Sequence, residues 1–452
     1  MSDTPPAPPG DGGPGDGGTA RSFSGGSPLN GNVVVPGDKS ISHRALLLAA
    51  LAEGESTITG LSTGDDVART LQAIEALGAG VTSAGGTVTV RGGRSGLHAP
   101  DGPLDLGNSG TGMRLLAGVV ATLAGTTVLT GDDSLRGRPM DRVAEPLRLM
   151  GATVGGQGER CLPPVTISGG DLHGIEYTPP MASAQVKSAI LLAGLAAGGE
   201  TVVHEPVATR PHTEDMLAAA GAEIDVEWDG GAKVIRVRRS DLACGAYTVP
   251  GDPSQAAFWT VAAAIIPGSL VTVEGIALSP ERLGFVGVLR RMGASIEVDE
   301  HDDGTGSVTG YTCALHGTDV EASEIPSLDE VPILAVAAAT ALGTTRFRDV
   351  GELRVKESDR LAGTADLVRA FGGRATVDGD ELVVEGTGSP LRPARIDALG
   401  DHRMAMAAAV AGAACAAGSG PTVVDGWDAV DTSYPGFAEE LDRLRAPGTV
   451  QW

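Results

Sequence analysis

The hydrophobic pattern of the chain repeats one arrangement six times. A polar motif opens a helix rich in Ala, Leu and Val; a short β-branched strand follows, and then an amphipathic helix and further strands. The motifs are spaced by 71, 72, 71, 78 and 71 residues and begin at Gly37, Asn108, Pro180, Gly251, Asp329 and Gly400. Repetition at one period over most of the chain predicts one unit, roughly β-α-β-α-β-β, used six times in an α/β fold.

The length of the period favours closed domains, because solenoid repeats are usually shorter. The last copy is truncated after Gly400, and a strand at Asn32 to Val35 is left over at the other end of the chain. Pairing these two pieces would close one domain from both ends of the chain. We therefore predict two domains of three units each.

Two nearly identical segments predict where the chain crosses between these domains. They are Val35-Pro36-Gly37-Asp38 and Val249-Pro250-Gly251-Asp252. Crossings there give an upper domain of residues 38–251 and a lower domain of residues 28–37 plus 252–452, with a ligand cleft between them. Residues 1–27 are rich in Pro and Gly, which is typical of a disordered tail.

The composition disfavours several classes of partner. A net charge of -24, without any run of Lys or Arg, speaks against nucleic acid and anionic membranes. The longest small-apolar stretch, residues 404–418, is too short to span a bilayer. The four cysteines lie far apart without the spacing of zinc ligands, which is typical of reduced thiols in a cytoplasmic protein. We expect no metal and no cofactor.

Lysine is scarce, because arginine supplies most of the 33 basic residues. The lysines are Lys39, Lys187, Lys233 and Lys356. In such a chain a lysine suggests a site that needs a compact ammonium, able to donate a proton or to fit a tight contact. Lys233 has no motif around it, and we interpret it as a surface strand residue.

The first helix-opening motif places charged residues at a helix start. Pro36-Gly37 ends an apolar strand, and Asp38 or Ser40 can cap the helix that follows. Lys39 and Arg44 then lie beside free backbone N–H groups with partial positive charge, an arrangement that favours a phosphate or carboxylate. A capped helix with a solvated Lys and Arg is the alternative for this motif taken alone.

Three further stretches of the upper domain offer polar groups before helices. A glycine-rich segment lets the backbone approach a ligand closely, although a tight strand-helix turn would look the same. Two arginines before the next helix suit carboxylate or phosphate contacts. A Ser and a Gln at a later helix start could merely cap it. The candidates are Asn108, Gly110, Arg138, Ser183, Gln185 and Arg210.

The lower domain holds the densest charges. Asp329 opens an otherwise apolar helix, for which simple N-capping is the strong alternative. The run Arg354-Val355-Lys356-Glu357-Ser358-Asp359-Arg360 would usually be a solvated charge run, but it precedes a helix and contains one of four lysines, so we favour a functional role. Arg403 lies at the start of the last apolar helix, where we expect it to meet an anion.

Several common motifs are missing. The sequence has no P-loop, HExxH zinc motif, complete dinucleotide GxGxxG or GxSxG elbow. What remains is a set of cations with Asp and Glu candidates, drawn from both domains onto helix starts. This set fits an interdomain cleft for two phosphorylated or carboxylated small molecules, with general acid–base groups and no metal.

Five segments together resemble the signatures of the 5-enolpyruvylshikimate-3-phosphate (EPSP) synthases, in order from about Pro28 to the C-terminus. They are Pro36-Gly37-Asp38-Lys39-Ser40, Gly107-Asn108-Ser109-Gly110-Thr111, Arg138-Pro139-Met140, the run from Arg354 to Arg360, and Asp401-His402-Arg403-Met404-Ala405-Met406. Residues 181–188 and Asp329-Glu330 resemble the class of this family that includes glyphosate-insensitive members.

The resemblance implies an inside-out α/β barrel in each domain, which is the enolpyruvyl transferase fold. It implies transfer of the enolpyruvyl group from phosphoenolpyruvate to the 5-hydroxyl of shikimate 3-phosphate, with release of phosphate through a tetrahedral intermediate, on the route to chorismate and the aromatic amino acids. It also implies these two small molecules as the partners, and we expect a monomer.

The resemblance also implies roles for single residues. Shikimate 3-phosphate would be held by Lys39, Ser40, Arg44, Ser183, Ala184, Gln185, Arg210, Asp329 and Lys356. Phosphoenolpyruvate would be held by Lys39, Asn108, Gly110, Arg138, Gln185, Arg360 and Arg403. For the proton transfers we expect Asp329 as the base and Glu357 or Lys39 as the acid, with Lys356 also in the catalytic group.

Three positions depart from the family pattern. Leu115 stands where many members have Pro, and Thr432 stands where they have a lysine, which puts phosphoenolpyruvate contacts there in doubt. Gly110 stands where insensitive members carry Ala, and the extra room favours inhibition by glyphosate.

Two alternatives stay open. The sister enzyme, UDP-N-acetylglucosamine enolpyruvyl transferase, typically has a reactive Cys five residues before the arginine that matches Arg138, and Asp133 stands there in this chain. A non-catalytic protein that binds organic phosphates would not need Asp329, Lys356 and Glu357 on loops that face the cleft.

Overall fold

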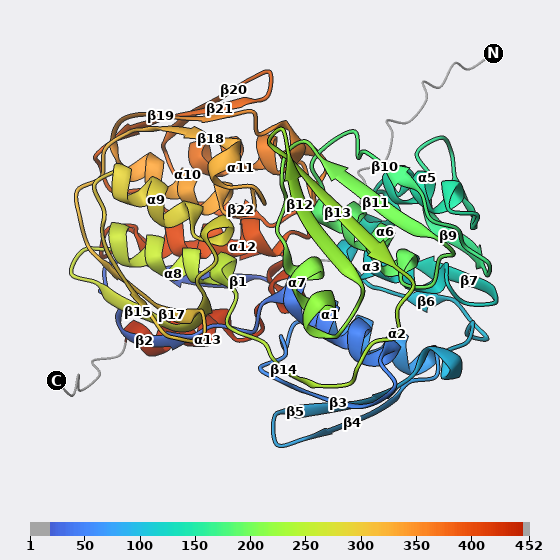
Figure 1. Cartoon of the computed structure of the whole chain (residues 1–452). Coiled ribbons are helices and arrows are strands. Elements are labelled where there is room, and N and C mark those ends of the chain that lie inside the picture. Colours follow the sequence, from blue (N-terminus) through green and yellow to red (C-terminus); the bar gives the residue numbers. More distant parts are fainter. Residues whose placement is uncertain (1–18, 446–452) are drawn as a thin grey trace, which may run out of the picture.

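The computed structural model describes residues 19–445. Figure 1 shows two halves side by side, one drawn in blue to green and the other mainly in yellow to red. Each half has its own buried core: one runs from Ala45 to Val249, and the other joins Phe23 to Val35 with Ala256 to Leu444. We propose these halves as the two domains, with boundaries at 37/38 and 251/252.

Three four-stranded sheets form the outside of the upper half. Their strand orders are β14–β3–β5–β4, β6–β7–β9–β8 and β10–β11–β13–β12. The strands are β3 (Gly54–Thr59), β4 (Gly80–Ala84), β5 (Thr87–Gly92), β6 (Leu104–Asp105), β7 (Gly125–Thr130), β8 (Thr153–Gln157), β9 (Leu162–Gly169), β10 (Glu176–Tyr177), β11 (Glu200–Glu205), β12 (Ile224–Asp229), β13 (Ala232–Arg238) and β14 (Ala246–Thr248). The helices are α1 (Lys39–Leu51), α2 (Asp65–Ala76), α3 (Gly110–Val120), α4 (Asp133–Arg136), α5 (Asp141–Leu149), α6 (Ala184–Gly194) and α7 (His212–Ala219).

The lower half repeats this plan. Its sheets are β2–β15–β17–β16, β18–β19–β21–β20 and the three-stranded β1–β23–β22. The strands are β1 (Arg21–Ser24), β2 (Asn30–Val34), β15 (Leu270–Ala277), β16 (Ser295–Glu300), β17 (Thr305–Tyr311), β18 (Asp319–Glu321), β19 (Leu342–Arg348), β20 (Arg374–Asp378), β21 (Glu381–Thr387), β22 (Arg395–Asp397) and β23 (Pro421–Asp425). The helices are α8 (Pro253–Ile265), α9 (Gly284–Arg291), α10 (Val331–Thr340), α11 (Arg360–Ala370), α12 (His402–Ala413) and α13 (Phe437–Arg445), and one short 3-10 turn, η4 (Gly351–Val355), bears on the site below.

The first helix of each unit lies inside its domain, enclosed by the sheets (Figure 1). These six helices are α1, α3, α6, α8, α10 and α12, and nearly every residue in them is buried. Small residues allow this packing; for example, a Cβ on Gly118 of α3 would lie 2.2 Å from the carbonyl oxygen of Ala189 in α6. The predicted α/β fold of six units is therefore confirmed. No helix in residues 19–445 is long and apolar enough to cross a membrane.

The strand before each crossing stays in a sheet of the half that the chain is leaving. β2 precedes the first crossing and pairs in parallel with β15, whereas β14 precedes the second crossing and pairs in parallel with β3. The crossings also bind each other, because the Asp38 amide donates to the Pro250 carbonyl (2.7 Å) and the Asp252 amide donates to the Pro36 carbonyl (3.0 Å). The segments that look alike in sequence are therefore partners in space.

Two predictions about the N-terminal region are wrong. The leftover strand does not complete the truncated last unit, since β2 belongs to the sheet of β15. Instead β1 pairs antiparallel with β23 and fills that place, so the predicted disordered tail of residues 1–27 fails for Arg21–Ser24. The physical reason is the ring of Phe23, which is 2% exposed and lies 4.8 Å from that of Trp427. The rest of the predicted tail that precedes residue 19 lies outside the described residues.

Phe23→Ala should lower the free energy of unfolding by about 3 kcal/mol, because it empties an aromatic site in the lower core. Denaturant unfolding measures this loss. Ser22→Ala, at an exposed position of the same strand, is the control and should change stability by less than about 0.5 kcal/mol. Equal, small effects of both changes would contradict the inclusion of β1 in this core.

Candidate active site

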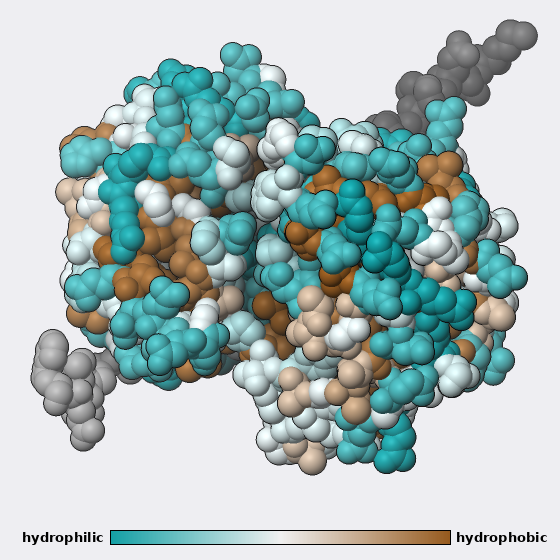
Figure 2. All heavy atoms as spheres, in the orientation of Figure 1, coloured by the Kyte–Doolittle hydropathy of each residue, from teal (hydrophilic) through white to brown (hydrophobic). Residues whose placement is uncertain are grey.

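A cavity of about 550 Å³ lies between the two halves, where Figure 2 shows a furrow in the surface. Residues at or just before the starts of all six inner helices line it. Helix starts expose unpaired N–H groups and carry partial positive charge, so their convergence favours anions. The cavity therefore attracts negative ligands although the chain as a whole is strongly acidic.

The sequence also explains why the helices begin there. Five of the six inner helices start with a side-chain cap that accepts a hydrogen bond from the first turn, and these caps are Asp38, Ser109, Ser183, Asp252 and Asp401. Such caps satisfy backbone donors that would otherwise lack partners. Capping and ligand binding are thus not competing interpretations of these motifs, because the caps fix the helix starts that face the cavity.

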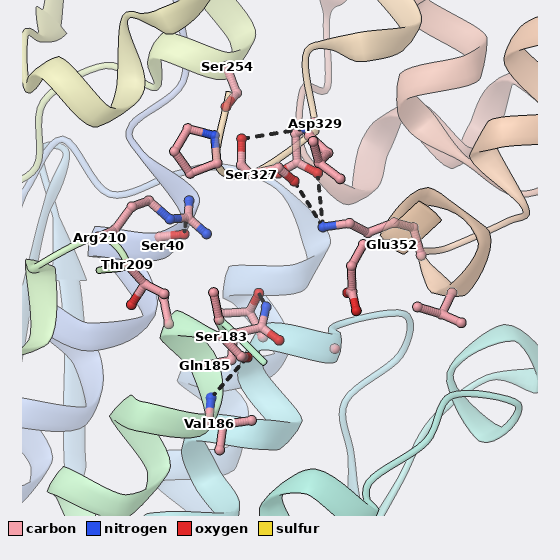
Figure 3. A pocket seen from close by; sticks show the side chains of 18 of the residues that line it. Ser40, Ser183, Gln185, Val186, Thr209, Arg210, Ser254, Ser327, Asp329 and Glu352 are labelled. Atoms are coloured by element: carbon pink, nitrogen blue, oxygen red, sulfur yellow. Dashed lines mark hydrogen bonds and ion pairs between the residues drawn. The ribbon is translucent and has the colours of Figure 1, made fainter. Parts of the chain in front are cut away.

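Most of the predicted site residues do line the cavity. They are Lys39, Ser40, Gly110, Arg138, Ser183, Ala184, Gln185, Arg210, Asp329, Lys356, Glu357 and Arg403. Figure 3 shows Ser40 and Arg210 on one side and Asp329 on another, with Ser183 and Gln185 below them. Three predicted residues are not part of the lining: Arg44, Asn108 and Arg360.

Arg44 is buried and its hydrogen-bond donors are used within the protein. Its guanidinium donates to Thr213 Oγ1 (2.7 Å), Ser188 Oγ (2.7 Å) and the Ser40 carbonyl (2.8 Å). Burial and the nearby Arg210 lower the pKa of Arg44 to about 10. The side chain therefore braces α1 against α6 and α7, and it supports Ser40 from behind.

Arg360 and Asn108 likewise hold other site residues. Arg360 is 1% exposed and forms a bidentate contact with Asp401 (2.7 and 3.0 Å). It also pairs with Asp329 (2.9 Å) and Glu357 (2.7 Å). The side-chain oxygen of Asn108 accepts a hydrogen bond from Arg138. Each of these two residues thus orients groups that line the cavity.

Asp329 is a carboxylate among cations. Besides Arg360, Lys356 and Arg403 each approach it to 3.7 Å. Burial raises the pKa of Asp329, but the charges of Arg403, Lys356 and Arg360 outweigh burial and hold it well below its ordinary value. Asp329 is therefore ionised near pH 7.

Glu357 lies at the contact between the halves. Its carboxylate is 3.7 Å from Arg138, and its carbonyl accepts a hydrogen bond from Ser134 Oγ (3.1 Å). Burial raises the pKa of Glu357, but the charges of Arg360 and Arg138 outweigh burial and hold this pKa well below its ordinary value. Glu357 thus joins the charged groups of both halves.

Sequence reasoning missed several residues at the cavity. Asp66 pairs with Lys39 (2.7 Å), and Arg142 pairs with Glu352 (3.2 Å) across the halves. Nothing local marks these contacts. Arg114 could have been found, because it follows Gly110 by one helical turn, and its guanidinium donates to Gln185 Oε1 (3.0 Å).

His402 also lines the cavity. Burial and the charge of Lys39 hold the pKa of His402 well below its ordinary value. The imidazole is therefore neutral near pH 7. Within residues 19–445, no group of three or more His, Cys, Asp or Glu side chains is arranged to hold a metal ion.

Comparisons with known proteins point to one family. The family model of EPSP synthase (3-phosphoshikimate 1-carboxyvinyltransferase) matches residues 23–441. The 3-phosphoshikimate 1-carboxyvinyltransferase of Acidiphilium cryptum (strain JF-5) is 48% identical over 419 residues, which cover 91% of this chain and 93% of that protein. The protein of the same name from Synechococcus sp. (strain JA-3-3Ab) is 47% identical over 431 residues, which cover 93% and 96%. A solved structure of EPSP synthase from Acinetobacter baumannii has a TM-score of 0.80 at 42% identity and covers 94% of this chain and 98% of that one.

The low pKa of Asp329 predicts a dependence of stability on pH. The unfolded chain, in which an Asp has a pKa of about 3.9, binds more protons than the folded one. The stabilisation by this carboxylate is thus complete well above about pH 4 and is lost as the pH falls towards the lower pKa of the folded state. Asp329→Asn should make the fall of unfolding free energy between about pH 5 and pH 3 shallower, as measured by urea unfolding. Identical slopes in both proteins would contradict a lowered pKa at Asp329.

Proposed function

Because the chain belongs to the EPSP synthase family, we propose that its cavity binds both substrates side by side and that Asp329, Lys356, Glu357 and Lys39 serve the chemistry. The enzyme transfers the enolpyruvyl group of phosphoenolpyruvate to the 5-hydroxyl of shikimate 3-phosphate and releases phosphate. The observation that carries the residue assignment is the convergence of cations from both halves on one cavity that also holds carboxylates of lowered pKa.

We assign shikimate 3-phosphate to the part of the cavity near Ser40 and Arg210. The contacting residues would be Lys39, Ser40, Ser183, Ala184, Gln185, Arg210, Asp329 and Lys356. Hydroxyl and amide groups suit a polyol, and the cations suit its phosphate and carboxylate. Arg44 contributes indirectly in this assignment, since its guanidinium holds the carbonyl of Ser40.

Phosphoenolpyruvate is assigned to the part nearer Arg138. Its contacts would be Lys39, Gly110, Arg138, Gln185 and Arg403, to which we add Arg114. Guanidinium groups match phosphate and carboxylate in bidentate geometry, and they offset the repulsion between two anionic substrates. Arg360 and Asn108 would act through the residues that they hold.

The reaction needs two opposite proton movements. In the addition, Asp329 takes the proton of the 5-hydroxyl and that oxygen bonds to C2 of phosphoenolpyruvate, while the C2=C3 double bond opens and an acid delivers a proton to C3. In the elimination, C3 of the tetrahedral intermediate loses a proton, the C2=C3 double bond reforms, and the C2–O bond to phosphate breaks. Glu357 or Lys39 would be the acid at C3, in reach of the second substrate.

Substrate binding itself would adjust these groups. Cations hold the pKa values of Asp329 and Glu357 low, so both carboxyls are ionised, which makes Asp329 a weak base and leaves Glu357 without a proton to donate. Two bound anions would offset those cations and raise both pKa values towards the range in which proton transfer is efficient. The cations that attract the substrates therefore also make the pKa values of Asp329 and Glu357 depend on substrate binding.

We further propose that the enzyme works as a monomer in the cytoplasm, without nucleic acid or membrane partners. The net charge of -24 disfavours nucleic acid and anionic membranes as partners, and the unpaired cysteines are typical of a cytoplasmic protein.

Release of inorganic phosphate tests the assignment of the acceptor. Purified protein with phosphoenolpyruvate should release phosphate in the presence of shikimate 3-phosphate and not with UDP-N-acetylglucosamine. Release only with the nucleotide sugar would indicate the sister transferase. No release with either acceptor would indicate a protein that merely binds organic phosphates.

Asp329→Asn should reduce kcat by about 10²-fold or more, since it removes the proposed base. Shikimate 3-phosphate should still bind, as measured by calorimetry. Normal turnover by an Asp329→Asn enzyme that binds both ligands would refute the base assignment.

Glu357→Gln separates the two proton transfers: in D2O it should slow incorporation of deuterium into the methylene group of phosphoenolpyruvate.

Gly110→Ala should raise the KM for phosphoenolpyruvate about tenfold, or ~1.4 kcal/mol. A Cβ there would lie 2.8 Å from Arg114 Nη1 and 3.1 Å from Arg138 Nη1, so both guanidiniums must move. We propose that the wild type is inhibited by glyphosate and that this change weakens inhibition in parallel.

Gly137→Ala is a matched control, because its Cβ would meet only ordinary contacts, the nearest at 3.4 Å from the Ser134 carbonyl. If Gly110→Ala leaves both the KM and glyphosate inhibition as they are in the control, these two guanidiniums do not bind phosphoenolpyruvate as proposed.

A further inference from the structure

Four charged side chains form a buried cluster in the upper half that no step of the reaction uses. Lys187 of α6 pairs with Glu205 at the end of β11 (2.9 Å) and with Glu214 of α7 (2.8 Å). Lys233 of β13 also pairs with Glu214 (2.7 Å). All four are buried, which corrects the interpretation of Lys233 as a surface residue; the partner that keeps it inside is Glu214, and no local pattern reveals that contact.

Stability alone does not account for such a cluster. Burying charges costs several kcal/mol per ion, and apolar residues of similar volume usually stabilise a core at least as well. Two cations and two carboxylates balance here, so the cluster is tolerated. Lys187 is nevertheless fully buried in the first turn of α6, and the helix beyond Ser188 is apolar. This position suggests that the cluster fixes something besides the core.

The third donor of Lys187 shows what is fixed. An ammonium has three donors, and after Glu205 and Glu214 the remaining one donates to the backbone carbonyl of Arg210 (3.1 Å). Glu205 in turn accepts a hydrogen bond from Thr209 Oγ1 (2.5 Å). The cluster therefore holds both ends of the dipeptide Thr209-Arg210, whose residues line the cavity.

The guanidinium of Arg210 has little support of its own. It makes one long hydrogen bond, to Ser40 Oγ at 3.5 Å, and Figure 3 shows it beside Ser40 at the cavity. Val207, earlier in the same loop, is 63% exposed. The direction of the Arg210 side chain thus depends on its backbone, which Lys187 anchors from the buried side.

We propose that Lys187 is a positioning residue for shikimate 3-phosphate: it fixes the backbone of Thr209-Arg210 so that the Arg210 guanidinium meets an anionic group of this substrate. The proposal rests on the assignment of Arg210 to that substrate. Lys187 reaches no ligand itself, since its three donors are occupied by the protein. Loss of Lys187 should therefore raise the KM for shikimate 3-phosphate more than the KM for phosphoenolpyruvate.

The test compares Lys187→Met with Lys233→Met, because both remove one ammonium from Glu214 but only Lys187 holds the Arg210 backbone. Lys187→Met should raise the KM for shikimate 3-phosphate about tenfold and change the KM for phosphoenolpyruvate and kcat by less than about threefold. Lys233→Met should lower the melting temperature without raising either KM. If Lys187→Met does not fold, the Lys187→Met/Glu205→Gln double variant removes a cation and an anion together and should show the same split.

Arg210→Gln, combined with Lys187→Met, makes a double-mutant cycle. Alone it should raise the KM for shikimate 3-phosphate, and adding Lys187→Met to it should give no further rise, because two residues that act through one contact are not additive. A wild-type KM in Lys187→Met, an equal rise in Lys233→Met, or additive effects with Arg210→Gln would each overturn the role of Lys187. A wild-type KM in Arg210→Gln would overturn the assignment of Arg210 itself, and this proposal with it.

Discussion

The arrangement of the two halves depends on one buried guanidinium. Arg282 is paired with Asp38 (2.7 Å) and Asp252 (2.5 Å), the residues that cap α1 and α8 at the two crossings. All three are buried, so each charge is stable there only while its partners are present; removing one partner of such a group typically costs about 3–5 kcal/mol. Because Lys39 and Ser40 directly follow Asp38, the contact that joins the two halves also positions the first residues that line the cavity.

The same principle recurs around the cavity, where several of the cations that face it are held by groups with no role in the proposed chemistry. Asp66 holds Lys39, Asn108 holds Arg138, and Lys187 holds the backbone of Arg210. Asp401 holds Arg360, which then reaches Asp329 and Glu357. A protein with a net charge of -24 can thus present a cationic cavity, because acidic residues beside the cavity are paired with cations and the helix starts add positive potential. Site geometry and domain contact are coupled, since Glu357 and Glu352 from the lower half meet Arg138 and Arg142 from the upper half.

Much of the fold could be predicted from the sequence because it is recorded in local patterns. Helix periodicity, glycine positions and Asp or Ser caps mark the six units, and the repeated Val-Pro-Gly-Asp segments mark the crossings. The cavity lining was also largely predictable, since a residue at the start of an inner helix must face the place where the helices converge. Arg114 belongs to this predictable class, as it lies one turn beyond Gly110.

What the sequence alone determined is therefore the α/β fold of six units, the family, and which helix starts line the cavity. Only the tertiary structure decided which charged side chains face the cavity and which turn inward. Arg44 and Arg360 occur in the site motifs, yet partners 144 and 41 residues away, Ser188 and Asp401, bind them inside the protein. Lys233 and the strand at Arg21–Ser24 are held by Glu214 and β23, which are equally remote from any local signal. Periodicity and capping act between neighbours in sequence, whereas the pairing of buried charges and the filling of the last sheet position depend on segments that meet only when the chain has folded.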